Sequence, residues 1–449
     1  MNTKKHDLTQ GKILKKLILI ATPIMGTSFI QMTHNLVDIF WLSRLSSGSV
    51  AASGSGGMYL WLSMSLLFIG RMGAEIGVSQ NIGKGDITKA QIYAQNASTL
   101  ATILGITYGL FLILLRVPLV SFFDIPEHEV VILTQQYLIF IAFSIPFMYT
   151  NAVITGCFTG FGNTKVPFYI NSSSLLINIA ISPLFIFTFN LGVIGAAVST
   201  SISQFIGFIM FVYAIKKYKH RPFNKFNLIT KPQWLYIKQI FKLGVPIAIE
   251  SALFTILTML VTRFVAGFGI GAMAIHRVGA QIEALSWLIG GGFASAVTAF
   301  TGQNFGASKF SRIREGFKVS VAVMVIWGLI ISIIMFFLAR QLMGIFFNDQ
   351  YELQMGIYYL RILAFMQIAI CVEGVAAGCF RGRGLTLYPS INSIIFNAIR
   401  VPFAYFLSLG PLGLNGIWIG LTIGAILRGI SMVVWYIINA KKLPKEDII

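Results

Sequence analysis

Several carboxylates stand inside long apolar runs of this 449-residue chain. Asp38 lies in the run from Leu17 to Arg44, which also contains Pro23, and Glu250 and Glu283 lie in two later runs. A charged group inside a membrane costs about 3 kcal/mol, so its presence usually indicates a function. The chemistry that fits a lone carboxylate there is the binding and release of a proton or a sodium ion. Asp38 could instead cap the outer end of its run, because it lies about 31 Å along a helix from Leu17.

A stripe of polar residues occupies the fifth apolar run of the chain. It consists of Asn171, Ser174, Asn178 and Ser182, whose spacings of three and four residues place them on one helical face. Facing Asp38, this stripe would form a small polar pocket. The alternative is that these residues hydrogen-bond neighbouring helices, as small polar residues do in membrane interfaces. Asn178 is the member that we favour as functional, because it stands near mid-depth.

Charged residues of both signs fall at similar depths in the second half of the chain. Counting from the helix ends places Glu250, Glu283, Arg400 and Arg428 near the middle of the membrane, with Glu373 deeper toward the cytoplasm. Unpaired burial would be prohibitive, so the first four are expected to form a charge-balanced cluster. Two interpretations stay open: a structural ion-pair network, or a site where at least one carboxylate, Glu250 first, exchanges a proton or sodium ion.

Enzyme motifs are missing from the sequence. There is no HExxH, phosphate-binding loop or GxSxG. We interpret His34 and His276 as packed or loop-proximal polar groups rather than ligands. The three cysteines lie in or beside apolar runs without metal-ligand spacing, so neither a disulfide framework nor a cofactor is expected.

The composition defines the class of protein that must position these residues. Hydrophobic residues make up 56% of the chain and charged residues 11%, against about 25% charged in soluble domains, which indicates an all-helical polytopic membrane protein. The net charge of +19 is assigned to loops rather than to nucleic-acid binding. Twelve spans are expected, at 17–42, 50–75, 95–118, 130–152, 166–189, 191–215, 238–263, 272–298, 318–342, 355–379, 388–409 and 412–439.

Basic residues alternate between the two ends of these spans. They gather before the first span, after every second span and at the end, with the densest group from Lys216 to Lys238. Acids such as Asp124 and Asp349 gather in the opposite loops. The positive-inside bias therefore predicts a multi-pass protein of the cell membrane with both termini cytoplasmic.

The two halves of the chain resemble each other. Three matched pairs occur in the same order: Pro23 and Pro246, Gln80 and Gln303, and Asn178 and Asn397. Their separations are 223, 223 and 219 residues. Six spans per half give both copies the same orientation in the membrane, so the repeat is parallel. We predict an N-terminal six-helix bundle at 1–215, a basic linker at 216–237 and a C-terminal bundle at 238–449.

These features together resemble the multidrug and toxic compound extrusion (MATE) family. The resemblance is carried by VDIFWLSRL in the first span, the duplicated QNxG, the GxPxxxE that ends at Glu250, and the two [TA]GCFxGxG segments. It implies two bundles around a V-shaped cleft and export of small organic compounds, often cationic, driven by H⁺ or Na⁺. By the same resemblance, Asp38 and Asn178 match residues of the N-terminal half, and Glu250 matches a carboxylate that helps to bind the coupling cation in some members, which would make it a ligand for Na⁺ if that is the coupling ion.

The sequence also departs from that family pattern. Ser182 stands where some members have an aspartate, and Glu373 is the nearest acid to the tenth-span aspartate of sodium-coupled members. Glu283, Arg400 and Arg428 are not part of the pattern. Because arginines favour an anionic ligand, a flippase for a lipid-linked saccharide is the alternative function, and a membrane-embedded enzyme is a remote one. We expect a monomer.

Overall fold

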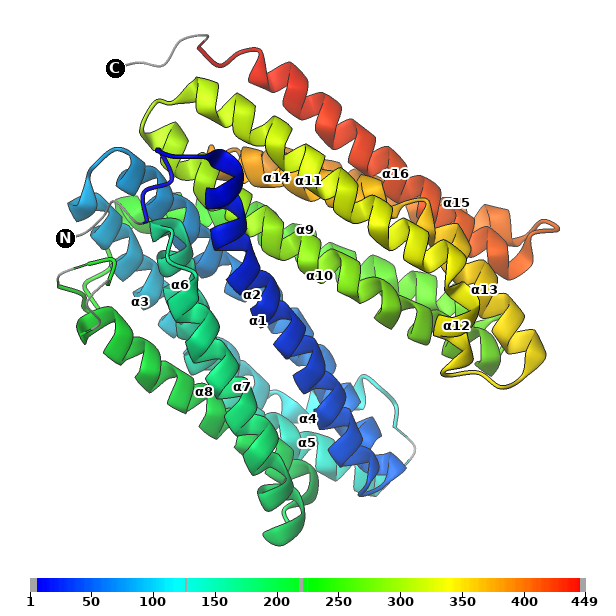
Figure 1. Ribbon diagram of the computed structural model, residues 1–449. Coiled ribbons are helices and arrows are strands. Elements are labelled where there is room, and N and C mark those ends of the chain that lie inside the picture. The colour runs from blue at the N-terminus through cyan, green and yellow to red at the C-terminus, as the bar shows by residue number, and fades with distance from the viewer. Residues whose placement is uncertain (1–5, 126, 218–220, 224, 445–449) are drawn as a thin grey trace. The chain divides into compact units, whose positions relative to one another are not determined.

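The computed structural model describes residues 6–125, 127–217, 221–223 and 225–444, and every regular element in them is helical (Figure 1). The first half contains α1 (Ile13–Ser43), α2 (Ser47–Gly83), α3 (Ile87–Leu114), α4 (Arg116–Ser121), α5 (His128–Ala142), α6 (Ile145–Phe161), α7 (Lys165–Pro183), the π-helical turn η2 (Leu184–Thr188) and α8 (Gly192–Lys217). The second half contains α9 (Trp234–Ala266), α10 (Ile270–Gly306), α11 (Phe310–Phe337), α12 (Ala339–Gly344), α13 (Gln350–Ala364), α14 (Gln367–Gly382), α15 (Leu387–Ser408) and α16 (Gly413–Ala440).

The long helices fall where the spans are expected, which confirms the all-helical membrane class. Within the described chain, nine helices are long and apolar enough to cross a bilayer, and two bent pairs raise the number to eleven. The bent pairs, α5 with α6 (46°) and α13 with α14 (41°), replace the single spans expected at 130–152 and 355–379. At the first bend Pro146 lies in the first turn of α6, where its missing backbone N–H is tolerated. The remaining expected span is α2, a 37-residue helix that is not among these eleven.

The chain divides into two compact units. Unit 1 contains the stretch up to Leu8 and Thr22–Ala248, and unit 2 contains Thr9–Ala21 and Ile249–Ile449. The limits at 215 and 238 expected from the repeat therefore differ from the compact units, in which α1 and α9 each contribute residues to both. The basic residues Lys4, Lys5 and Lys445 used for the predicted topology lie outside the described residues.

The expected linker at 216–237 belongs to unit 1, although residues 218–220 and 224 lie outside the described chain. Asn96 Oδ1 on α3 accepts a hydrogen bond from Gln233 N at 2.7 Å, and Thr99 Oγ1 accepts one from Thr230 N at 3.0 Å. Phe223 is fully buried in the core of unit 1. This part of the linker is packed against α3 rather than being a loose tether.

The internal repeat is visible in the helix packing of each unit. A Cβ atom at Gly160 on α6 would lie 2.7 Å from Glu75 O on α2. At the matching position in unit 2, a Cβ at Gly382 on α14 would lie 2.6 Å from Thr298 O on α10. Both contacts require glycine because the helix backbones approach too closely for a side chain. The duplicated GCFxGxG segments therefore allow close packing of the equivalent pair of helices in each unit.

Candidate functional site

In unit 1 the candidate site begins with two residues one turn apart on α1. The i,i+4 spacing places His34 and Asp38 on one helical face, with His34 Nε2 3.4 Å from Asp38 Oδ2. The same Nε2 lies 2.8 Å from Asn178 Oδ1 on α7. An amide oxygen only accepts, so Nε2 carries the hydrogen in this arrangement. The His34 side chain is 9% exposed and Asp38 28%, which leaves the carboxylate accessible from outside the fold.

Asn178 is the centre of this network, and α8 fixes its orientation. Its Nδ2 donates to Thr200 Oγ1 and Ser203 Oγ, both at 3.2 Å. Its Oδ1 also accepts from Ser182 Oγ at 3.0 Å, and Ser182 Oγ lies 2.9 Å from Ser199 Oγ. With both donors used, the amide oxygen is directed toward His34. Buried polar networks of this kind hold one arrangement because each member has a partner.

The predicted polar stripe on α7 is split between two neighbours. Ser174 Oγ donates to Ser203 O at 2.6 Å, so it faces α8 as Asn178 and Ser182 do. Asn171 Nδ2 instead lies 3.5 Å from Thr155 Oγ1 on α6.

Two contributions to the unit 1 site were missed from the sequence. His34 is buried, as expected of a packed polar group, but its contacts with Asp38 and with Asn178 of the stripe were not foreseen. The α8 residues from Ser199 to Ser203 were not singled out. The signal that could have found them is the STSIS run inside an apolar helix.

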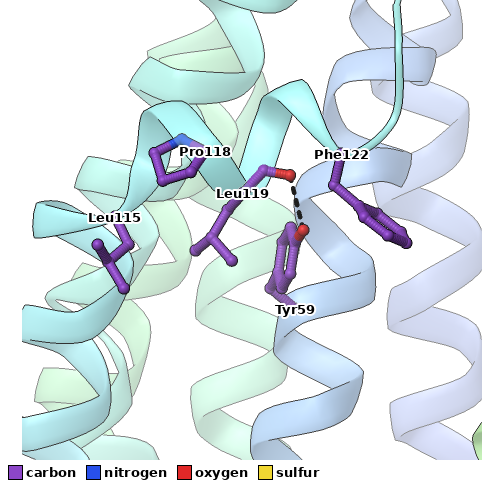
Figure 2. Close-up of a pocket in the computed structure, with 5 residues that line it drawn as sticks. All are labelled: Tyr59, Leu115, Pro118, Leu119 and Phe122. Carbon is purple, nitrogen blue, oxygen red and sulfur yellow. Dashed lines mark hydrogen bonds between the residues drawn. The ribbon is translucent and has the colours of Figure 1, made fainter.

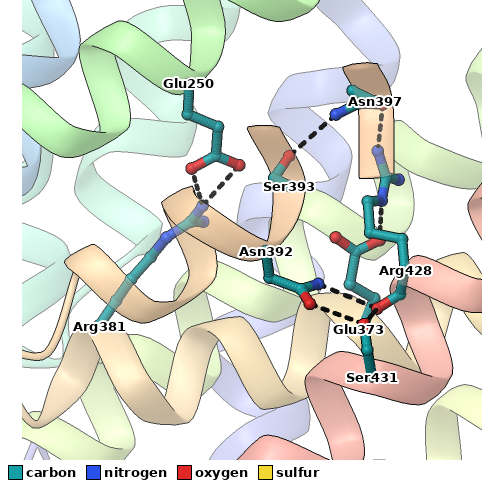
Figure 3. Close-up of polar contacts among 8 residues, drawn as sticks. All are labelled: Glu250, Glu373, Arg381, Asn392, Ser393, Asn397, Arg428 and Ser431. Carbon is teal, nitrogen blue, oxygen red and sulfur yellow. Dashed lines mark hydrogen bonds and ion pairs between the residues drawn. The ribbon is translucent and has the colours of Figure 1, made fainter. Parts of the chain in front are cut away.

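Unit 2 contains two arginine–glutamate ion pairs (Figure 3). Arg381 Nη2 on α14 lies 3.3 Å from Glu250 Oε2 on α9, and Ser390 Oγ on α15 donates to the same oxygen at 2.9 Å. Arg428 Nε on α16 donates to Glu373 Oε2 on α14 at 2.8 Å. Both carboxylates therefore face a guanidinium that keeps its charge at all physiological pH values.

Amide and hydroxyl groups extend the second ion pair (Figure 3). Arg428 Nη1 donates to Asn397 Oδ1 at 2.9 Å, and Asn397 Nδ2 donates to Ser393 Oγ at 3.0 Å. Ser431 Oγ donates to Asn392 Oδ1 at 2.6 Å, and Asn392 Nδ2 donates to Arg428 O at 3.0 Å. The Arg428 guanidinium is thus enclosed by partners from α14 and α15.

The charge pairing differs from the expected cluster of Glu250, Glu283, Arg400 and Arg428. Arg400 Nη2 donates to Thr258 Oγ1 at 3.0 Å, and its guanidinium lies 5.0 Å from the centre of the Phe254 ring. Arg400 and Arg428 act on Glu283 electrostatically. Glu250 pairs with Arg381, which lies just beyond the span expected at 355–379. Depth along a helix can be counted from the sequence, but the direction in which each helix face points cannot.

The described residues were considered as ligands for a metal ion or a cofactor. They contain no group of three or more histidine, cysteine, aspartate or glutamate side chains that could hold a metal ion. The three cysteines are buried and free. A surface pocket of about 390 Å³ is lined by Tyr59, Leu115, Pro118, Leu119 and Phe122 (Figure 2). Tyr59 Oη donates to Leu119 O in this pocket. None of the candidate carboxylates and arginines lines it.

Comparison with known proteins shows which family this chain resembles. The MatE family model matches residues 23–184 and again 246–406, one copy in each half. The chain is 28% identical to the probable multidrug resistance protein NorM of Thermotoga maritima, over 95% of this chain and 92% of that protein. It is 23% identical to the multidrug export protein MepA of Staphylococcus aureus, over 96% and 95%.

Solved structures show the same fold. A crystal structure of MATE in complex with MaD3S superposes with a TM-score of 0.92 at 23% identity, covering 98% of this chain and 99% of that one. A transporter of the MOP superfamily from Pyrococcus furiosus superposes with a TM-score of 0.89 at 22% identity, with the same coverage. Two copies of one family model, in order and across most of the chain, show that this protein belongs to the MatE family.

Proposed function

We propose that this protein is a secondary active antiporter that exports small organic compounds, many of them cationic, in exchange for H⁺ or Na⁺ by alternating access. It acts as a monomer in the cell membrane, with both termini in the cytoplasm. Relatives named as multidrug resistance and multidrug export proteins support the export of organic compounds. The ion exchange rests on the geometry of unit 1.

The observation that carries the proposal is the network of Asp38, His34 and Asn178. Asp38 is an accessible carboxylate on a membrane-spanning helix, and His34 ties it to a buried amide that α8 holds in place. Tyr137 is a further titratable group that interacts with Asp38 electrostatically. A proton or sodium ion at Asp38 would cancel the charge that attracts His34. The contact between α1 and α7 would then weaken.

The position of Pro23 allows this change to reach the rest of α1. Proline interrupts the hydrogen bonds of a helix interior, so α1 can bend there. In our proposal, ion binding at Asp38 bends α1 and lowers affinity for the exported compound. Release of the ion to the cytoplasm restores the first state, so an inward ion gradient drives export.

The test is uptake of a fluorescent cation into inverted membrane vesicles. An imposed pH gradient and an imposed sodium gradient are collapsed in turn. The proposal expects uptake that stops when one of the two gradients is removed. Uptake that is indifferent to both gradients would overturn it.

A second candidate function, the flipping of a lipid-linked saccharide, is favoured by Arg400. Its hydrogen-bond partner is the neutral Thr258, and its Nε is buried with no partner among the described residues. Such a guanidinium suits a phosphate group. Binding of an anionic lipid-linked precursor to the purified protein, lost in Arg400→Ala, would support this candidate, and absence of binding would exclude it.

A further inference from the structure

The two ion pairs of unit 2 differ in length and in exposure (Figure 3). Arg428 reaches Glu373 at 2.8 Å, within the usual range for a charge-assisted bond, and both side chains are 13% exposed. Arg381 reaches the two oxygens of Glu250 through a single nitrogen, Nη2, at 3.3 and 3.5 Å. Each arginine reaches its carboxylate through one nitrogen, but the Arg381–Glu250 contact is about 0.5 Å longer than a strong charge-assisted bond, as the distances above show. Arg381 therefore holds Glu250 weakly.

The rest of the Arg381 side chain points to the same conclusion. Its Nε is buried and has no hydrogen-bond partner in the described part of the chain. A buried donor without a partner destabilises the state that contains it. The arrangement with Arg381 on Glu250 is consequently one that a competing cation can displace at low cost.

Glu250 stays oriented without Arg381. Ser390 Oγ donates to its Oε2 at 2.9 Å, so a second helix fixes the carboxylate independently of the arginine. Glu250 is 18% exposed and Arg381 21%, which makes this the more accessible of the two ion pairs. If Arg381 moves away, an oriented negative charge remains, and it requires another cation.

We propose that Arg381 is a built-in competitor for cationic ligands at Glu250, and that the ligands it competes with are compounds carrying a protonated amine. The amine donates to the carboxylate as Nη2 of Arg381 does, and Ser390 keeps its bond to Oε2. Only a ligand that binds Glu250 better than the loosely held guanidinium gains the site. Arg381 thus sets a threshold for the cations that unit 2 accepts, and this inference rests on the proposed export function.

The experiment measures equilibrium binding of quinacrine, a protonated amine, to the purified full-length protein by calorimetry without any gradient. Arg381→Gln should bind quinacrine about tenfold more tightly, because the Arg381 guanidinium no longer competes with the amine for Glu250. Arg381→Lys keeps a competing cation and should stay near the wild type. The double variant Glu250→Gln/Arg381→Gln should lose the gain. Thermal unfolding of each variant checks that it is folded.

Arg383 provides a matched control, because it lies two residues further along and no described carboxylate contacts it. Arg383→Gln removes the same charge and should leave quinacrine affinity within about threefold of the wild type, because Arg383 does not pair with Glu250. An equal gain in Arg383→Gln, or no gain in Arg381→Gln, would overturn the inference. Failure of the wild type to export any compound under either gradient would overturn the proposed function instead, and this is measured separately in vesicles.

Discussion

The two units use an asparagine from matching positions of the repeat in different ways. Asn178 in unit 1 accepts a hydrogen bond from His34, which pairs with Asp38. Asn397 in unit 2 accepts one from Arg428, which pairs with Glu373. The same scaffold thus holds a histidine–aspartate contact in one unit and an arginine–glutamate ion pair in the other.

This difference follows from substitutions on equivalent helices. The positions 223 residues after His34 and Asp38 are Leu257 and Val261 on α9, which cannot carry charge. The ion pair that contacts Asn397 in unit 2 instead comes from Glu373 on α14 and Arg428 on α16. From this difference we propose that the ion exchange belongs to unit 1, whereas Arg428 keeps Glu373 paired in unit 2.

The largest expected effect is that of Asp38→Asn. The amide retains the size of the side chain but cannot exchange a proton or attract a cation. We expect export of a fluorescent cation from whole cells to fall at least about tenfold, because loss of one charge-assisted interaction is worth about 1.4 kcal/mol or more. The measurement is the initial rate of efflux at matched expression. Efflux within twofold of the wild type would remove Asp38 from the mechanism.

The next effect tests the fixed pair of unit 2. Arg428→Gln leaves Glu373 without its cation in a site that is 13% exposed, and breaking a buried pair in this way costs about 3 kcal/mol. Thermal unfolding of the purified variant should therefore begin at a clearly lower temperature. The double variant Glu373→Gln/Arg428→Gln removes both charges and should recover most of the loss. An unchanged unfolding temperature in the single variant would mean that the pair is not structural.

His34→Gln separates hydrogen bonding from charge in unit 1. Glutamine can still donate to the Asn178 amide but never becomes cationic. We expect transport to fall about tenfold, because the variant loses one charge-assisted contact with Asp38. The readout is the initial transport rate at matched expression. A rate within twofold of the wild type would show that His34 acts only as a hydrogen-bond donor.

The smallest effect compares the helix starts that follow the two QNxG segments. Asp86 caps α3 by accepting from Lys89 N at 2.9 Å, whereas Lys309, 223 residues later, makes no side-chain cap on α11. That backbone bond, followed by the Lys89 ammonium, lowers the pKa of Asp86. The stabilisation is therefore complete above the ordinary aspartate value of about 3.9 and is lost as the pH falls through the lowered value.

For this cap, Asp86→Ala should lower the unfolding temperature by no more than about 2 °C at pH 7, and by less at pH 3. Thermal scans at the two pH values measure the difference. An Asp86→Ala effect that grows as the pH falls would contradict the capping account.

Much of the fold could be predicted from the sequence because membrane thickness and hydrophobicity fix the helices almost independently of tertiary contacts. The repeat and the polar stripe on α7 could also be predicted, because both appear in the residue types and their spacing. The direction in which each side chain points could not be predicted. Arg381 reads as a loop charge because it follows an apolar run, yet the last turn of α14 directs it to Glu250. His34 reads as a packed polar group because nothing local reveals that α7 brings Asn178 to it.

The central claim is that the coupling ion exchanges at Asp38 in unit 1 rather than at Glu250 in unit 2. The most direct measurement compares Asp38→Asn with Glu250→Gln in inverted vesicles energised by the same gradient. We predict that Asp38→Asn abolishes gradient-driven uptake of a fluorescent cation, whereas Glu250→Gln changes the concentration for half-maximal uptake but keeps the dependence on the gradient. Uptake that stays gradient-driven in Asp38→Asn and loses its gradient dependence in Glu250→Gln would contradict the account.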